Sequence, residues 1–164
     1  MLSDENDFFK RELQIDSEAT FLELNDFILD SLGYARDELT TFHICDEEWQ
    51  KELEITMMDM GASSDEDSYL MADTRLEDLL DHKGQHLFFV FDMLSERGFF
   101  IELAELIPGK SLDKPIVTKA EGKAPKQLES IEVAASRLAT PATGEPWDDE
   151  LFSDESVDEG DIDL

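Results

Sequence analysis

Two apolar runs joined by a polar turn constrain this chain more than any other feature. Residues 86–94 contain three phenylalanines and residues 98–107 contain two, with Ser95-Glu96-Arg97 between the runs. Aromatic and β-branched residues favour strands, and a short polar link between two such runs predicts a β-hairpin. Because the first run is nearly continuous in apolar residues, we expect it to be a central strand that is covered on both faces.

Two capping boxes predict helices. Thr20 is followed three residues later by Glu23, before an apolar stripe that ends near Gly33. A Ser/Thr–Glu pair at this spacing satisfies the free amides of a first helical turn, and glycine favours the left-handed residue after a last turn. We therefore expect a helix over residues 20–32. Thr74 and Glu77 predict a second, short helix in the same way.

Three further strands are expected, the first of them from period-two patterning. Between residues 8 and 16 one face carries Phe9, Leu13 and Ile15, with Arg11 as a long polar stem among them. Residues 41–45 and 54–60 are also typical of short strands. The run 61–68 is rich in Gly, Ser and acidic residues and favours an exposed loop.

These elements predict an α+β fold in a single compact domain. We expect a mixed or antiparallel sheet with a central hairpin, packed by two or three helices, over residues 8–107. Residues 1–7 are interpreted as a flexible N-terminus. Residues 108–139, with five lysines between 109 and 126, are interpreted as a surface segment followed by a short helix after Pro125. Residues 140–164 have the composition of a disordered acidic tail.

The charge of the chain excludes several classes of partner. Thirteen basic residues against 42 acidic ones leave a net charge of −29. Residues 145–164 hold ten acids and no base, so −19 remains on residues 1–144. Nucleic acids and anionic membranes repel such a surface. We expect no direct nucleic-acid or membrane binding, and a basic protein as partner.

Cysteine content and the N-terminal sequence indicate a reducing compartment. Cys45 is the only cysteine, so the chain has no internal disulfide. Residues 1–7 lack the basic and apolar regions of a signal peptide, and no stretch approaches eighteen apolar residues. We expect a cytoplasmic protein.

No motif in the chain predicts catalysis or metal binding. His82 and His86 have helical spacing, but Gly84 lies between them and His86 begins a predicted strand. The acidic run 59–67 lacks the ligand alternation of an EF-hand loop. The apolar context of Cys45 is expected to raise its thiol pKa, and neither a serine elbow nor a phosphate-binding loop occurs. We expect a non-enzyme with no cofactor, catalytic residue or metal.

Asp92 and Arg97 form a candidate polar site. Asp92 interrupts an apolar strand, so a buried carboxylate there needs a partner such as Arg97, Arg11 or a turn amide. The alternative is a strand-end aspartate that accepts from the following turn. A third interpretation, an enzyme or small-ligand site, requires Asp92 within hydrogen-bond reach of His43 or His86.

The acidic tail contains a candidate partner-docking segment. Apolar groups embedded in acid can dock on a basic, apolar groove and become ordered on binding. The alternative is a solubilising tail with incidental aromatics. The candidate docking residues are Trp147, Asp148, Asp149, Glu150, Leu151 and Phe152.

Three blocks of sequence, residues 20–34, 74–80 and 87–92, resemble the plasmid pRiA4b ORF-3-like family in order and spacing. The resemblance covers residues 8–107 and implies a compact α+β domain in a family of mobile-element passengers without established activity. Family members usually continue the aspartate strand as Asp-Phe-Gly-Asp followed by Trp and His, and here only Asp92 matches. They also tend to have a histidine at the position of Asn25, and one more strand before the first. A polar site built from those groups is therefore expected to be absent here.

Charge and the lack of catalytic groups together predict a non-enzymatic protein-binding or regulatory module that acts through its folded surface and its acidic tail. The alternative is a nucleic-acid mimic that occupies a DNA-binding protein. Mimicry predicts a regular array of carboxylates on one face.

Overall fold

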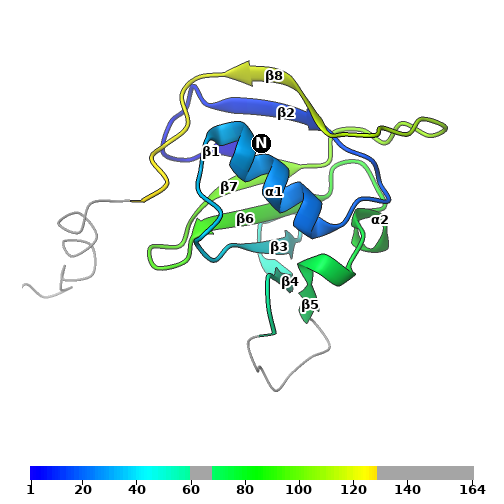
Figure 1. Ribbon diagram of the computed structural model, residues 1–164, viewed down its shortest axis with the longest axis horizontal. Helices are drawn as coiled ribbons and strands as arrows, with labels where there is room; N and C mark the ends of the chain where they lie inside the picture. Colours follow the sequence, from blue (N-terminus) through cyan, green and yellow to red (C-terminus); the bar gives the residue numbers. More distant parts are fainter. Residues whose placement is uncertain (60–67, 129–164) are drawn as a thin grey trace, which may run out of the picture. The chain divides into compact units, whose positions relative to one another are not determined.

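The computed structural model describes residues 1–59 and 68–128. Residues 1–128 form one folded unit, with an eight-stranded sheet, one long helix and two short helical turns (Figure 1). This is the expected α+β class with a mixed sheet. The elements are β1 (Leu2–Ser3), β2 (Lys10–Gln14), α1 (Phe21–Leu32), β3 (Thr41–Cys45), β4 (Lys51–Thr56), β5 (Ser68–Leu70), η1 (Met71–Asp73), α2 (Leu76–Leu79), β6 (His86–Asp92), β7 (Arg97–Glu102) and β8 (Ile116–Glu121).

The predicted hairpin is the centre of the sheet. The strand order is β5-β4-β3-β6-β7-β1-β2-β8, so β6 and β7 each have a neighbour on both sides. Neighbouring strands are antiparallel except β4 and β5, which are parallel. Long antiparallel pairing at the centre satisfies the backbone groups of the most apolar part of the chain.

Helix α1 is confirmed together with both of its caps. The Thr20 hydroxyl accepts from the Glu23 amide at 3.1 Å, and the Glu23 carboxylate accepts from the Thr20 amide at 2.9 Å. Gly33 follows the last turn in the left-handed conformation, with φ of 74°. A cap of this kind contributes about 1 kcal/mol. The start and the end of α1 are therefore set by residues within the helix or directly beside it.

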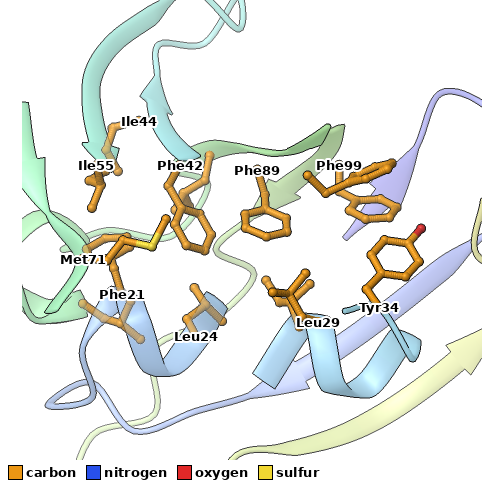
Figure 2. Close-up of a cluster of buried hydrophobic side chains, with 14 of the residues drawn as sticks. Phe21, Leu24, Leu29, Tyr34, Phe42, Ile44, Ile55, Met71, Phe89 and Phe99 are labelled. Carbon is orange, nitrogen blue, oxygen red and sulfur yellow. The ribbon is translucent and has the colours of Figure 1, made fainter. Parts of the chain in front are cut away.

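The core lies between α1 and one face of the sheet (Figures 1 and 2). Phe21, Leu24 and Leu29 from α1 face Phe42 and Phe89 from the sheet in Figure 2. Burying each large apolar side chain contributes about 2 kcal/mol, so the phenylalanines dominate the stability of the domain. Among the described residues, six phenylalanines are fully buried: Phe9, Phe21, Phe42, Phe89, Phe91 and Phe99.

The second face of the central strand differs from the prediction. Within the described residues, α1 packs on one face of β6, and no helix packs on the other. Phe88 and Phe100, whose side chains point to that other face, are half-buried. The expectation that β6 is covered on both faces is therefore wrong for this face. The apolar run is continuous because aromatic residues occupy both faces, not because both are covered by helices.

Several element boundaries also differ from the prediction, and β7 ends at Glu102 where an apolar run to residue 107 was expected. Strand β4 runs from Lys51 to Thr56, not over 54–60, because a tight turn returns the chain soon after β3. Helix α2 begins one residue later than expected. Its first turn is capped by the Asp78 carboxylate, which accepts from the Arg75 amide at 2.9 Å, while the Thr74 hydroxyl donates to the Leu70 carbonyl at 2.8 Å.

Three strands, β1, β5 and β8, lie in segments for which no strand was predicted. β1 pairs with both β7 and β2, and β8 pairs with β2 along its length. The folded unit therefore extends beyond the expected core of residues 8–107. Most of the helix expected after Pro125, the acidic tail 140–164 and the loop expected at 61–68, except Ser68 at the start of β5, lie outside the described residues.

Candidate functional site

The sheet face opposite α1 carries a half-exposed aromatic cluster. Side chains alternate along a strand, so residues paired with one another across β3, β6 and β7 share this face. His43 pairs with Phe88, and Phe88 pairs with Phe100. All three are half-buried. We call the surface formed by Trp49, His86, Phe88 and Phe100 the aromatic face.

The turn between β3 and β4 places Trp49 on this face. The Asp46 carboxylate accepts from the amides of Glu48 and Gln50, both at 2.8 Å, and the Trp49 amide donates to the Asp46 carbonyl at 3.1 Å. These bonds hold Trp49 at φ of 65°. A bulky side chain in the left-handed region costs roughly 1–3 kcal/mol. The turn maintains a strained conformation that presents the indole.

Aromatic contacts run from Trp49 across the face. The indole stacks on the His86 ring with centroids 3.9 Å apart and 3° between planes. It meets Phe100 edge-on at 4.9 Å, and Phe100 lies 5.1 Å from Phe88. His86 is oriented by a contact of 3.0 Å between its Nδ1 and the Asp46 carbonyl. The cluster is thus held from both the turn and the sheet.

Gly98 makes room for the Phe88 ring on this face. A Cβ at position 98 would lie 2.4 Å from the Phe89 carbonyl oxygen and 2.7 Å from Cζ of Phe88. Only a glycine allows the ring to lie this close to β7. The flat packing of the cluster against the sheet therefore depends on this one residue.

The charges around the aromatic face are mainly negative. Glu47 and Glu48 are exposed beside Trp49, and Glu102 lies at the end of β7 with its side chain 60% exposed. Lys51 is the nearby cation, with Nζ 5.7 Å above the Phe88 ring. Burial and the nearby Lys51 lower the pKa of His43 to about 4, so this ring is neutral at neutral pH.

A cross-strand row on the same face resembles a thiol–imidazole–carboxylate arrangement. Cys45 pairs with His86, and His86 pairs with Glu102. Burial raises the pKa of the Cys45 thiol, the direction that its apolar context predicted, and its Sγ contacts the His43 carbonyl at 3.7 Å. The thiol is therefore protonated at neutral pH and does not supply a thiolate nucleophile.

The structure brings the sequence-predicted pair Asp92 and Arg97 together. The Arg97 Nη1 donates to the Asp92 carboxylate at 3.2 Å, and Asp92 also accepts from the Ser95 amide at 3.3 Å. Arg97 has a side chain only 6% exposed. Its Nε and Nη2 donate to the two carboxylate oxygens of Glu5, both at 3.0 Å. Asp92 therefore has both kinds of partner that the sequence suggested, a charged side chain and a turn amide.

Arg97 also anchors residues 122–128, which we call the strap. Its guanidinium donates to the carbonyls of Lys126 at 2.6 Å and Gln127 at 3.1 Å. Burial raises the pKa of Tyr34 above its usual range, so its hydroxyl stays protonated and donates to the Pro125 carbonyl. The Asp92–Arg97 pair therefore contacts main-chain and side-chain groups of the chain itself and acts as a clamp.

A groove of about 420 Å³ lies beside the strap, lined in part by Arg11, Ser31 and Tyr34. The Arg11 guanidinium donates to the carbonyls of Glu121 at 2.7 Å and Gly122 at 3.1 Å. These bonds fasten β2 to β8 and the strap. The polar side chains of Arg11 and Tyr34 in the groove therefore already hold parts of the fold together.

The structure separates the histidines considered as ligands. The His82 ring lies 2.6 Å from the Asp81 carboxylate on an exposed turn, whereas His86 belongs to the aromatic face. Among residues 1–59 and 68–128, no three His, Cys, Asp or Glu side chains form a metal-binding group. The hydrogen bonds of Asp92 described above go to Ser95 and Arg97, and to neither His43 nor His86. The docking segment 147–152 lies outside the described residues.

The aromatic face was not predicted from the sequence, although two signals for it were present. Phe88 and Phe100 alternate with core residues in the two most apolar strands, and Trp49 stands in a turn of acidic residues. Asn25, where the family resemblance suggested a histidine, is fully buried and accepts from the Thr40 hydroxyl at 2.5 Å.

Comparison with known proteins agrees with this fold. Residues 1–131 match the family described as plasmid pRiA4b ORF-3-like protein. The chain belongs to this family. No curated protein matches the chain. Within the described residues, no helix has the length and apolarity needed to cross a bilayer.

A solved structure shares the fold of this pRiA4b ORF-3-like protein. It is the crystal structure of a protein of unknown function from Methanosarcina mazei Go1, with a TM-score of 0.54 and 17% sequence identity. The match covers 68% of this chain and 61% of the archaeal chain. At this identity the likeness concerns the fold alone.

Proposed function

We propose that this protein is a non-enzymatic binding module that docks a basic protein partner on its aromatic face, with the acidic C-terminal segment adding long-range attraction. One observation carries the proposal. A half-exposed aromatic cluster, centred on a strained Trp49, lies on the sheet face that no described helix covers.

Aromatic residues that remain partly exposed on a folded surface favour protein recognition. Tyr, Trp and Phe are enriched in interfaces, and tryptophan is a frequent energetic hot spot. Backbone strain at Trp49 adds support, because strained residues concentrate at binding sites. Stacking on His86 at 3.9 Å also fixes the indole before any partner arrives, which reduces the entropic cost of binding.

Charge favours a basic partner. Glu47, Glu48 and Glu102 are exposed around the aromatic face, and the whole chain carries −29. Complementary charge accelerates association and excludes acidic competitors. The ten acids of residues 145–164 extend this attraction, which solution salt screens beyond about 10 Å.

The distribution of carboxylates gives no support to nucleic-acid mimicry. Exposed acids occur on α1 at Glu23 and Asp30, in the β3–β4 turn, on α2 at Glu77 and on β8 at Glu121. They belong to α1 on one face of the sheet, to the turn beside the aromatic face, to α2 and to the edge strand β8. A duplex mimic needs a regular array on one face.

The experiment compares the full-length protein with a double variant, Trp49→Ala/Phe100→Ala, as bait in host extract. Phe8→Ala is the matched control, because Phe8 is 83% exposed and lies outside the aromatic face. The retained basic protein is then purified, and its affinity for each bait is measured by calorimetry. Loss of a hot-spot aromatic predicts at least a tenfold weaker affinity for the double variant.

Two controls complete the test. The Phe8→Ala protein should bind as the wild type does, and deletion of residues 140–164 should weaken binding at low salt more than at high salt. A partner that binds the double variant and the wild type with equal affinity would contradict docking on the aromatic face.

A further inference from the structure

Strand β8 forms a long, open edge of the sheet. It is the last strand in the order and pairs with β2 along one side (Figure 1). Within residues 1–59 and 68–128, no backbone hydrogen bond joins its other side. In an edge strand, alternate residues direct their N–H and C=O groups outward, and these groups form a template for a further strand. The backbone of β8 is therefore available for strand addition.

The side chains of β8 are also accessible to a partner. All six residues of the strand are exposed. Ile116 and Val117 remain 44% and 39% exposed, and because successive residues of a strand point to opposite faces, each face offers apolar surface to an added strand. The opposite edge of the sheet differs, since β5 has three residues and all of them are half-buried.

Two features protect this edge against indiscriminate pairing. The register with β2 shifts next to Thr118, whose hydroxyl donates to the Glu12 carbonyl at 3.2 Å. Lys119 follows directly, with its side chain 44% exposed. A bulge and an edge lysine both oppose the addition of an arbitrary strand. An added strand is therefore selected by its charge.

The charge around β8 is opposite in sign to that of the whole chain. Residues 109–126 hold five lysines and two acids, 5 − 2 = +3, whereas the whole chain carries −29. Lys10 of β2 pairs with Glu121, one of those two acids. Opposite charges on neighbouring strands stabilise the pairing and like charges destabilise it. The local charge therefore favours an acidic strand.

A second copy of this chain fits the edge less well. Pairing of two β8 strands would bring together two segments of +3, and each copy would add −29 of long-range repulsion. A short acidic segment meets only the local lysines, because salt screens the more distant charges beyond about 10 Å.

We infer that β8 binds an extended acidic segment of a partner protein, which adds to the sheet as a further strand with its carboxylates beside Lys119 and the other lysines of residues 109–126. Main-chain hydrogen bonds supply the contact in this mode of recognition, and side chains supply the selectivity. The inference goes beyond the proposed function, because β8 lies at the end of the sheet and the aromatic face lies on β6, β7 and the β3–β4 turn.

The test is an NMR titration of the ¹⁵N-labelled full-length protein with three synthetic peptides. In the first, threonine alternates with glutamate. In the second, lysine replaces glutamate. The third has the acidic sequence with every backbone nitrogen methylated, which keeps the charge and removes the N–H donors. Shifts of the β8 amides measure binding at this edge, whatever binds elsewhere on the protein.

We expect the acidic peptide to bind at β8 at least about fivefold more tightly than either of the other two. It should also slow the hydrogen exchange of those β8 amides that exchange fast in the free protein. Equal affinity of the methylated peptide, or binding without this protection, would overturn strand addition. Equal affinity of the lysine peptide would overturn the preference for an acidic segment, and absence of binding at β8 would overturn both.

A charge reversal at one position provides a second test. Lys119→Glu should weaken the acidic peptide by at least about fivefold. Lys51→Glu is the matched control, because Lys51 is also an exposed strand residue but belongs to β4, near the opposite edge. Thermal melts establish that both variants are folded. Equal weakening in the two variants would overturn the inference, as would protection of the β8 amides that rises with concentration of the free protein, since a second copy would then hold the edge.

Discussion

Arg97 is the residue on which three distant parts of the chain converge. Its guanidinium joins Glu5 near the N-terminus, Asp92 across the β6–β7 turn and two carbonyls of the strap. A buried cation with a complete set of partners is tolerated, whereas removing the cation leaves carboxylates without their charge partner in a poorly solvated place. The residue therefore matters more for what it holds together than for the strength of any one pair.

Arg97→Ala should lower the free energy of unfolding by about 3 kcal/mol or more, because breaking a buried pair leaves uncompensated charge. Urea unfolding followed by circular dichroism measures the change. Arg36→Ala is the control. Arg36 also bonds two aspartates, Asp26 and Asp30, but its side chain is 53% exposed, so its removal should cost less than about 1 kcal/mol. Equal losses in the two variants would contradict the clamp.

His43 makes part of the stability depend on pH. Burial lowers its pKa from 6.5 to about 4 in the folded state. The unfolded chain therefore binds a proton that the folded chain does not, and stability falls as the pH decreases from about 6.5 to about 4. In His43→Gln this part of the acid dependence, about 1 kcal/mol after allowance for solvent screening, should disappear.

Urea midpoints of wild type, His43→Gln and the exposed control His82→Gln across this pH range test the prediction. Only His43→Gln should show a flatter profile than the wild type. A profile for His43→Gln that runs parallel to the wild type would show that His43 is protonated equally in the folded and unfolded states.

At the scale of elements, the β3–β4 turn places the Trp49 side chain on the aromatic face. Asp46 holds the turn through its side chain, and Trp49 occupies the left-handed region with φ of 65°. The neighbouring strands supply the stacking partners His86 and Phe100. The backbone of the turn and the ring contacts with His86 and Phe100 together position the indole.

The strain at Trp49 predicts an unusual order of variant stabilities. Trp49→Gly and Trp49→Ala lose the same indole contacts, but only glycine adopts a positive φ without cost. Trp49→Gly should therefore be more stable than Trp49→Ala by about 1 kcal/mol in chemical unfolding.

Lys51, an exposed strand residue two positions later, provides the control for this comparison. There the order should reverse, with Lys51→Ala more stable than Lys51→Gly, because glycine weakens a strand. The same order at both positions would argue against strain in the turn.

At the scale of the whole molecule, charge opposes folding while the clamp and the core support it. A net charge of −29 repels itself, and salt screens this repulsion. Deleting residues 140–164 removes ten acids and changes the net charge to −29 + 10 = −19. It removes no residue of the sheet, α1 or the strap, which all belong to residues 1–128.

We therefore expect the melting temperature to rise with added salt for the full-length protein. At high salt, the protein lacking residues 140–164 should melt at nearly the same temperature as the full-length one. Calorimetric scans at low and high salt measure both effects. A large loss of stability in the shortened protein at high salt would show that the C-terminal segment contributes contacts to the folded unit.

The sequence alone determined the elements whose signals are local. Helix α1 was predictable because Thr20, Glu23 and Gly33 lie within the chain segment that they cap. The β6–β7 hairpin was predictable because two adjacent apolar runs flank a short turn. The family was recognised from the order and spacing of residues 20–34, 74–80 and 87–92. Asp92 and Arg97 could be paired in advance because they flank the same turn.

Only the tertiary structure decided the remainder, because its contacts join residues far apart in the chain. β8 became a strand by pairing with β2, which lies about a hundred residues earlier. Glu5 met Arg97 because β1 lies beside β7. The aromatic face exists because a single helix covers one side of the sheet, and which side of a strand remains open is a property of the packed molecule and not of the strand.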